Sequence, residues 1–129
     1  MTGIKEEIRL TVHRFVDCIN EGDPECLITW QTEDFTFIDY DGDKTQGRDG
    51  WPAYFHNNPD YTIHGDHMIT SGTGVAVLGR TTGSHVAPEV EKKETILWIA
   101  EVRNDLISEW RLYSDTKEIE QQLESDIDE

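Results

Sequence analysis

Residues 92–115, KKETILWIAEVRNDLISEWRLYSD, carry the strongest β-sheet signal in this 129-residue chain. Two apolar-rich runs meet at Asn104-Asp105, a pair that is typical of a tight two-residue hairpin turn. Residues 96–99 are consecutive and apolar, which is typical of a strand covered on both faces. We therefore predict a long hairpin in a curved sheet, with a pocket beneath one face and a second subunit or more protein against the other.

A two-residue turn sets the pairing within the predicted hairpin. Regular pairing places Ile99 opposite Trp110, and on the other face it places Trp98 opposite Arg111, with Tyr113 beside them. An aromatic wall with an occasional polar group is typical of a small-molecule pocket, and the same residues also fit an ordinary core or a Trp98–Arg111 cation–π pair. Trp98, Arg111 and Tyr113 are therefore predicted ligand-binding residues.

The N-terminal part of the chain has helical periodicity. Apolar residues recur at helical spacing over residues 3–20, which predicts an amphipathic helix. Gly22 supplies a helix stop, and Asp23-Pro24 supplies an N-cap followed by a proline suited to the first helical position. A second, short helix is therefore expected directly after the first.

Alternating residues predict a strand over 34–40, a turn, and a short returning strand over 44–46. The sequence Gly-Arg-Asp-Gly at 47–50 then leads into a third predicted helix. That helix carries Trp51 and Phe55, which face either the mouth of a pocket or the neighbouring sheet. Both are predicted ligand-binding residues.

The pattern changes to strands after the third helix. Four strands are predicted, over residues 61–70, 74–86, 91–103 and 106–114. Helices followed by a strand meander predict an α+β fold in one domain over residues 1–115. The acidic tail, 116–129, has an apolar residue at every fourth position from Ile119, which fits either a helix resting on the sheet or a solvated end.

The net charge of -16 argues against nucleic acid and anionic membranes as partners, because both carry phosphate charge. No apolar run reaches the roughly 20 residues that a membrane-spanning helix needs, and residues 5–9 are charged where a signal peptide would be apolar. We therefore expect a cytoplasmic protein with a small, neutral, apolar ligand. Cys18 and Cys26 flank a predicted turn, so a disulfide is geometrically possible, but we favour buried reduced thiols.

Three stretches carry a family resemblance: INEGDPECLITW at 19–30, FIDYDGDKTQGRDGWPAYF at 37–55, and NDLISEWRLYSD at 104–115. Their order and spacing resemble the SnoaL-like polyketide cyclases and ketosteroid isomerase-like proteins of the nuclear transport factor two-like, or cystatin-like, superfamily. The resemblance covers roughly residues 4–115. It implies a cone in which a bent sheet wraps around the first helix and encloses an apolar pocket. It also implies a homodimer packed sheet against sheet, and we expect no cofactor.

The resemblance singles out Asp39. In the similar ketosteroid isomerases, a carboxylate after this strand and just before a glycine turn is the general base, and FIDYDG matches that pattern. Such a base needs apolar surroundings that raise its pKa, and Phe35 and Phe37 would provide them. The alternative is a strand-end aspartate whose side chain caps the following turn.

Two positions depart from the patterns of the similar enzymes. Phe15 stands where the isomerases place a tyrosine on the first helix, and it is a predicted ligand-binding residue. Trp98 stands where the cyclases place an aspartate, counted back from the last hairpin. An isomerase, cyclase or dehydratase that works by proton transfer fits the resemblance, and so does a non-catalytic ligand-binding or dimerisation module.

Histidines supply the remaining candidates. His85 resembles a histidine that follows a threonine-rich strand in several cyclase-like proteins, and it could act as acid or base. Its alternative is a strand-end histidine near solvent. On a regular strand His64 and Asp66 share one face and His67 lies on the other, so we expect no metal site there, although Asp66 and His64 could form an assisting dyad.

Overall fold

A computed structural model describes residues 4–46 and 50–127 of the chain. The helices are α1 (Ile4–Glu21), α2 (Pro24–Thr29), α3 (Trp51–Asn57), α4 (Pro88–Glu91) and α5 (Thr116–Ile127). The strands are β1 (Gln31–Ile38), β2 (Lys44–Gln46), β3 (Thr62–Ser71), β4 (Gly74–Thr82), β5 (Ile96–Arg103) and β6 (Leu106–Ser114). The described strands form one sheet in the order β2-β1-β6-β5-β4-β3. The predicted α+β arrangement is therefore confirmed.

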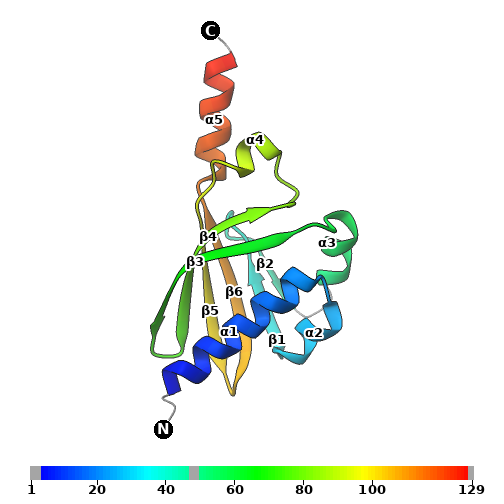
Figure 1. Cartoon of the computed structure of the whole chain (residues 1–129), viewed down its shortest axis with the longest axis vertical. Helices are drawn as coiled ribbons and strands as arrows, with labels where there is room; N and C mark the ends of the chain where they lie inside the picture. Colours follow the sequence, from blue (N-terminus) through cyan, green and yellow to red (C-terminus); the bar gives the residue numbers. More distant parts are fainter. Residues whose placement is uncertain (1–3, 47–49, 128–129) are drawn as a thin grey trace.

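The long helix α1 crosses the inner face of the sheet (Figure 1). Its apolar stripe, which includes the fully buried Val12, Phe15 and Ile19, packs against inward-facing residues of the strands. The helical spacing in the sequence is the reason, because residues three and four apart lie on one face of a helix. The sheet is antiparallel except where β1 runs parallel to β6.

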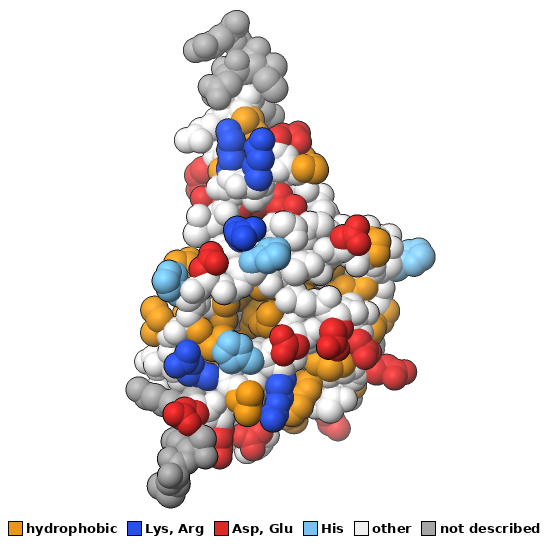
Figure 2. Space-filling view, in the orientation of Figure 1, with side chains coloured by type: hydrophobic (Ala, Val, Ile, Leu, Met, Phe, Trp, Pro, Cys, Tyr) orange, Lys and Arg blue, Asp and Glu red, His pale blue; other side chains and the backbone are white. Residues whose placement is uncertain are grey.

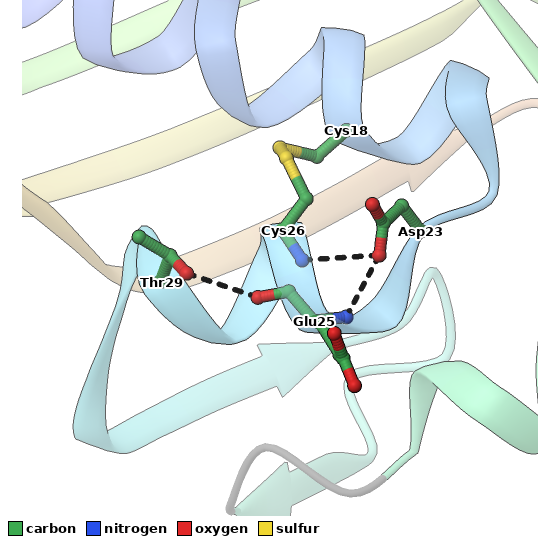
Figure 3. The surroundings of a disulfide bond; sticks show 5 residues. All are labelled: Cys18, Asp23, Glu25, Cys26 and Thr29. Carbon is green, nitrogen blue, oxygen red and sulfur yellow. Dashed lines mark hydrogen bonds between the residues drawn. A yellow bond between two sulfur atoms is a disulfide. The ribbon is translucent and has the colours of Figure 1, made fainter.

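The junction between α1 and α2 is held in two ways (Figure 3). Gly22 adopts a φ of +64°, and Oδ1 of Asp23 accepts hydrogen bonds from the backbone N–H groups of Glu25 and Cys26 at 3.1 and 3.2 Å. Cys18 and Cys26 form a disulfide, with 5.6 Å between their Cα atoms. The prediction of reduced thiols was wrong, because the sharp corner brings the two residues to the separation that a disulfide requires.

The predicted hairpin turn is confirmed. Asn104 and Asp105 have φ values of 53° and 63°, the positive values that a two-residue turn between twisted strands requires. The strands that leave this turn are not regular, however. Val102 pairs with Ile107, and the next pair joins residues 101 and 109, so that Ser108 is the extra residue of a β-bulge in β6.

The bulge overturns the predicted register. Ile99 pairs with Arg111 and not with Trp110. Trp98 and Trp110 lie together on the inner face, with 6.3 Å between ring centroids. Arg111 and Tyr113 lie on the outer face, so the prediction that they share a face with Trp98 was wrong. A single extra residue has this effect because side chains alternate between faces along a strand.

A second irregularity lies in β3. His64 pairs with Arg80 and His67 pairs with Leu78, with a register shift between residues 65 and 67. The two histidines therefore share the outer face, and the prediction that they lie on opposite faces was wrong. Here too a bulge, at Asp66, breaks the alternation on which the prediction relied.

The two ends of the meander also differ from expectation. The strands predicted over 74–86 and 91–103 are shorter in the structure: β4 ends at Thr82, β5 begins at Ile96, and the short helix α4 lies between them. The tail is helical, but α5 extends beyond the sheet and lies beside α4 (Figure 1). The Gly-Arg-Asp start predicted for α3, residues 47–49, lies outside the described residues. No helix in the described part of the chain is long and apolar enough to span a membrane.

Candidate functional site

A pocket of about 380 Å³ lies between the inner face of the sheet and α3. Its walls come from β1, β5, β6 and α3, and from segments that adjoin these elements. Most of the lining side chains are aromatic: Phe35, Phe37, Tyr40, Trp51, Tyr54, Tyr61, Trp98 and Trp110. A concave, largely apolar cavity of this size with a few polar groups is typical of a small-molecule site.

Phe15 supports the pocket wall from behind. Its ring centroid lies 6.0 Å from those of Phe35 and Trp51 and 5.0 Å from that of Trp110, all three of which line the cavity. Phe15 is fully buried and does not itself line the cavity. Its position on α1 therefore fixes the wall and presents no polar group to a ligand.

Trp51 closes one side of the pocket from the first turn of α3. Its ring stacks on that of Phe55 at 5.6 Å and meets that of Phe37 edge-on at 6.4 Å. Phe55 does not line the cavity and packs behind Trp51. The predicted pair on this helix thus divides into one lining residue and one supporting residue.

Asp39 lies at the end of β1, half-buried, and lines the pocket. Its Oδ1 accepts hydrogen bonds from the backbone N–H groups of Asp41 and Asp43 at 2.9 and 3.0 Å, across a turn in which Gly42 has a φ of +85°. Both interpretations of the sequence therefore apply to the same side chain, which caps the turn and faces the cavity. The second oxygen, Oδ2, is the atom left for a bound molecule.

The acidic turn has a basic partner on α5. Carboxylate oxygens of Asp39, Asp41 and Asp43 lie within 4.8 Å of one another. The Lys117 ammonium pairs with Oδ1 of Asp41, and this hydrogen bond raises the pKa of Lys117. The cluster of negative charge at the pocket mouth is thus partly balanced, and clustering alone gives no ground for a metal ion.

His85 lies across the same pocket and bonds to α3. Its Nδ1 is 3.1 Å from Oη of Tyr54, whose ring stands edge-on to that of Tyr61 at 5.0 Å. Burial raises the pKa of Tyr54 to about 12, and burial also raises the pKa of Tyr61. Both phenols therefore keep their protons at neutral pH, and Tyr54 can donate to Nδ1 of His85.

A smaller hollow of about 40 Å³ adjoins the pocket. The two spaces share the lining residues Tyr40, Tyr54, Tyr61, His85 and Leu112. Glu94 and several hydroxyl groups line the small hollow. Sequence reasoning missed Glu94 because it lies in a segment predicted as strand. A usable signal was present, since Pro88 followed by acidic residues is typical of a helix start.

Several predicted residues lie away from the pocket. Arg111 and Tyr113 are on the outer face, where the guanidinium carbon lies 4.9 Å from the centroid of the tyrosine ring. His64 and Asp66 line neither hollow, and Nε2 of His64 lies 3.0 Å from Oγ1 of Thr82. Asp39, His85, Trp51 and Trp98 are the predicted residues that the fold brings to one cavity.

Comparison with known families gives one clear result. The model of the SnoaL-like domain matches residues 12–110, which is most of the chain. No curated protein sequence matches the chain.

Solved structures with the same fold are distant in sequence. A candidate SnoaL-like polyketide cyclase from a Jannaschia species superposes with a TM-score of 0.74 at 17% identity, covering 93% of each chain. A candidate ketosteroid isomerase from Kribbella flavida gives 0.69 at 18% identity, covering 85% of this chain and 78% of the other. An uncharacterized cystatin-fold protein from Novosphingobium aromaticivorans gives 0.70 at 19% identity, covering 85% and 98%. These likenesses confirm the predicted cystatin-like α+β fold.

Proposed function

The chain belongs to the SnoaL-like domain family, and on that premise we propose that it binds a small, largely apolar carbonyl or ring compound and moves a proton on it. One observation supports this most directly. Asp39 and His85, two groups able to transfer protons, line the same aromatic pocket of about 380 Å³. Isomerisation, cyclisation and dehydration all fit, since each begins with a proton transfer next to a carbonyl group.

In this proposal Asp39 is the general base. Phe35 and Phe37 line the pocket beside it, so an apolar substrate can place a C–H group next to the carboxylate. The two N–H groups that hold Oδ1 fix the orientation of the carboxylate and leave Oδ2 for the substrate. Asp39 then returns the proton that it took to another carbon of the substrate, and His85, oriented by Tyr54, assists by donating a hydrogen bond to the substrate oxygen on which negative charge develops.

A second candidate function is ligand binding without chemistry. In the resemblance, Phe15 and Trp98 occupy the places of the isomerase tyrosine and the cyclase aspartate; phenylalanine has no donor for an oxyanion, and tryptophan cannot act as a base. Both are fully buried among other aromatic rings. A protein that uses this cavity to hold a ligand, or a module that only dimerises, fits that observation.

We also propose a homodimer formed by the outer face of the sheet. Three large apolar side chains on this face are exposed: Ile69 by 68%, Tyr113 by 44% and Leu78 by 39%. The pairing of β3, β4, β5 and β6 puts them on the same side. Exposed apolar patches of this kind mark interaction surfaces, and a second copy offers the same patch in return.

A cytoplasmic location is our proposal too. Disulfides such as that between Cys18 and Cys26 are more common in oxidising compartments, so the location is tested directly by cell fractionation. Recovery of the protein outside the cytoplasmic fraction would contradict the proposal.

The proposed chemistry can be tested without the natural substrate. Purified protein is screened by thermal shift against neutral cyclic ketones and enones, because a true ligand stabilises the native state. Those that bind are incubated in D₂O, and uptake of deuterium next to the carbonyl is followed by mass spectrometry. Enhanced uptake supports proton transfer. Binding without enhanced uptake favours the second candidate function, and no binding by any probe contradicts both.

A further inference from the structure

Glu94 has a buried carboxylate oxygen that lacks a partner. The residue is only 7% exposed. Its Oε2 accepts hydrogen bonds from Oγ of Ser114, at 3.0 Å, and from Oγ1 of Thr116. Its Oε1 is buried and has no hydrogen-bond partner among the described residues. Buried polar atoms in folded proteins are nearly always paired, because leaving one unpaired costs about 1–3 kcal/mol.

The small hollow places Glu94 next to the main pocket. Glu94 lines that hollow, and the hollow shares Tyr54, Tyr61 and His85 with the pocket. A volume of about 40 Å³ accommodates a water molecule or one group of similar size. A ligand whose body fills the pocket could therefore place one small polar end group beside Glu94.

The charges near this hollow favour a cationic end group. Among the described residues, no lysine or arginine lines either hollow, whereas Asp39 and Asp41 line the pocket and Glu94 lines the small hollow. The negative charges of Glu91 and Glu94 contribute, after burial, to the raised pKa of Tyr54. The pocket's many aromatic faces also attract cations.

Glu91, the last residue of α4, differs from Glu94 in the hydrogen bonds of its carboxylate. It is also buried, but its Oε2 accepts hydrogen bonds from Oγ1 of Thr81, at 3.2 Å, and from the backbone N–H of Ser84, at 2.9 Å. These bonds tie α4 to the end of β4, which is a structural role. Of the two buried glutamates, Glu94 is the one that lines the hollow.

We propose that Oε1 of Glu94 binds the protonated amine of a ligand whose apolar part occupies the aromatic pocket. The inference rests on the proposed ligand-binding function and narrows it to primary amines with an apolar or aromatic body. An ammonium group supplies the donors that Oε1 lacks and the charge that the carboxylate favours. A neutral hydroxyl supplies a donor alone, and a carboxylate supplies neither.

Three probes of nearly equal size separate these cases: 2-phenylethylamine, 2-phenylethanol and phenylacetate. Their affinities for the unmodified protein are measured by calorimetry at about 0.15 M salt, where long-range attraction to the acidic surface is screened. We expect the amine to bind at least about tenfold more tightly than the alcohol. We expect no binding of phenylacetate. Equal or tighter binding of the alcohol would overturn the proposal, and this comparison needs no variant.

A matched pair of variants locates the effect. Glu94→Gln should abolish the preference for the amine and leave the affinity for the alcohol unchanged. Glu89→Gln removes the same charge from an exposed position on α4 and should leave the preference intact. An equal loss in both variants would show a general attraction to the acidic protein and would refute a specific role for Glu94.

These experiments distinguish failure of the Glu94 proposal from failure of the proposed function. If neutral ketones bind or exchange protons while 2-phenylethylamine shows no advantage over 2-phenylethanol, only the role of Glu94 falls. If no ketone, alcohol or amine binds, the pocket itself is not a ligand site and both proposals fall.

Discussion

Oη of Tyr54 lies 3.1 Å from Nδ1 of His85 and joins α3 to the segment after β4. The phenol keeps its proton because burial raises its pKa to about 12, so it is able to donate to Nδ1 of His85. Nδ1 of a neutral His85 that carries its proton on Nε2 can accept this hydrogen bond. Although His85 lies at an exposed site, its orientation is therefore set by a neighbour that is mostly buried.

The strength of this link can be measured with a double-mutant cycle. Tyr54→Phe retains the ring that packs edge-on against Tyr61 and removes only the hydroxyl. We expect it to lower the free energy of unfolding by about 1 kcal/mol, the usual value for one hydrogen bond. Combined with His85→Ala in urea unfolding, it should show a coupling energy of similar size. Additive losses would mean that the two side chains do not interact in solution.

Stability should fall at alkaline pH because of the buried tyrosines. The pKa of Tyr54 rises from its ordinary value of 10.0 to about 12 in the folded chain, and that of Tyr61 is raised as well. Below pH 10 both states keep the proton, so the contribution of Tyr54 to stability is complete. Between pH 10 and about 12 the unfolded chain releases it first, and stability is lost. Urea unfolding over this range should show a shallower decline for Tyr54→Phe than for the unmodified protein, and parallel declines would contradict the assignment.

Asp39→Asn separates the two roles of that side chain. The amide oxygen of asparagine can still accept from the backbone N–H groups of Asp41 and Asp43, so we expect the midpoint of thermal unfolding to change little. An amide cannot take a proton, so deuterium uptake by a bound ketone should fall by about 100-fold or more. Asp43→Asn, at an exposed position off the pocket, is the control and should retain uptake. Undiminished uptake in Asp39→Asn would remove Asp39 from the mechanism.

The outer face of the sheet predicts a dimer in solution. We expect light scattering coupled to size-exclusion chromatography to give twice the mass of the chain. Ile69→Asp should convert it to a monomer, because a charge at this exposed apolar position cannot be desolvated without cost. Ile28→Asp makes the same change on α2, away from the sheet, and should leave the dimer intact. A monomeric unmodified protein would refute the proposed interface.

The disulfide should contribute measurably to stability. Cys18 and Cys26 are separated by 8 residues, and closing a loop of that length restricts the unfolded chain enough to stabilise the fold by about 2–3 kcal/mol. Reduction by dithiothreitol should therefore lower the urea midpoint. The double variant Cys18→Ser, Cys26→Ser should match the reduced protein and show no response to the reductant. A midpoint that ignores the reductant in the unmodified protein would count against the bond.

Local chemistry made parts of this fold predictable from sequence. Asn104-Asp105 marks a turn because few residue pairs accept two positive φ values. Asp23-Pro24 marks a helix start because it supplies an N-cap and a preset φ. Asp39 could be placed at the pocket by the resemblance carried by the glycine turn that follows it. Each signal is contained within a few neighbouring residues.

The rest depended on contacts that the sequence does not show. Nothing in the residues around Ser108 distinguishes a bulged strand from a regular one, because the bulge arises from twist and from packing on the inner face. The predicted register was therefore wrong beyond this point, and the position of Trp110 in the pocket wall was not predicted. The small hollow was not predicted for another reason. Glu94 follows a four-residue helix, α4, which is too short to have a clear periodicity.

The bulge at Ser108 determines which side chains of β6 face the cavity. If β6 paired regularly from the turn onward, Arg111 and Tyr113 would face the cavity and Trp110 would lie on the outer face. The bulge absorbs Ser108, so every position after it pairs as it would in a regular strand that lacked this residue. Deleting that residue would leave Trp110 inside, since the ladder would then run without interruption in the same phase. During evolution the hairpin can therefore gain or lose one residue at this point while the chemistry of the cavity is inherited unchanged.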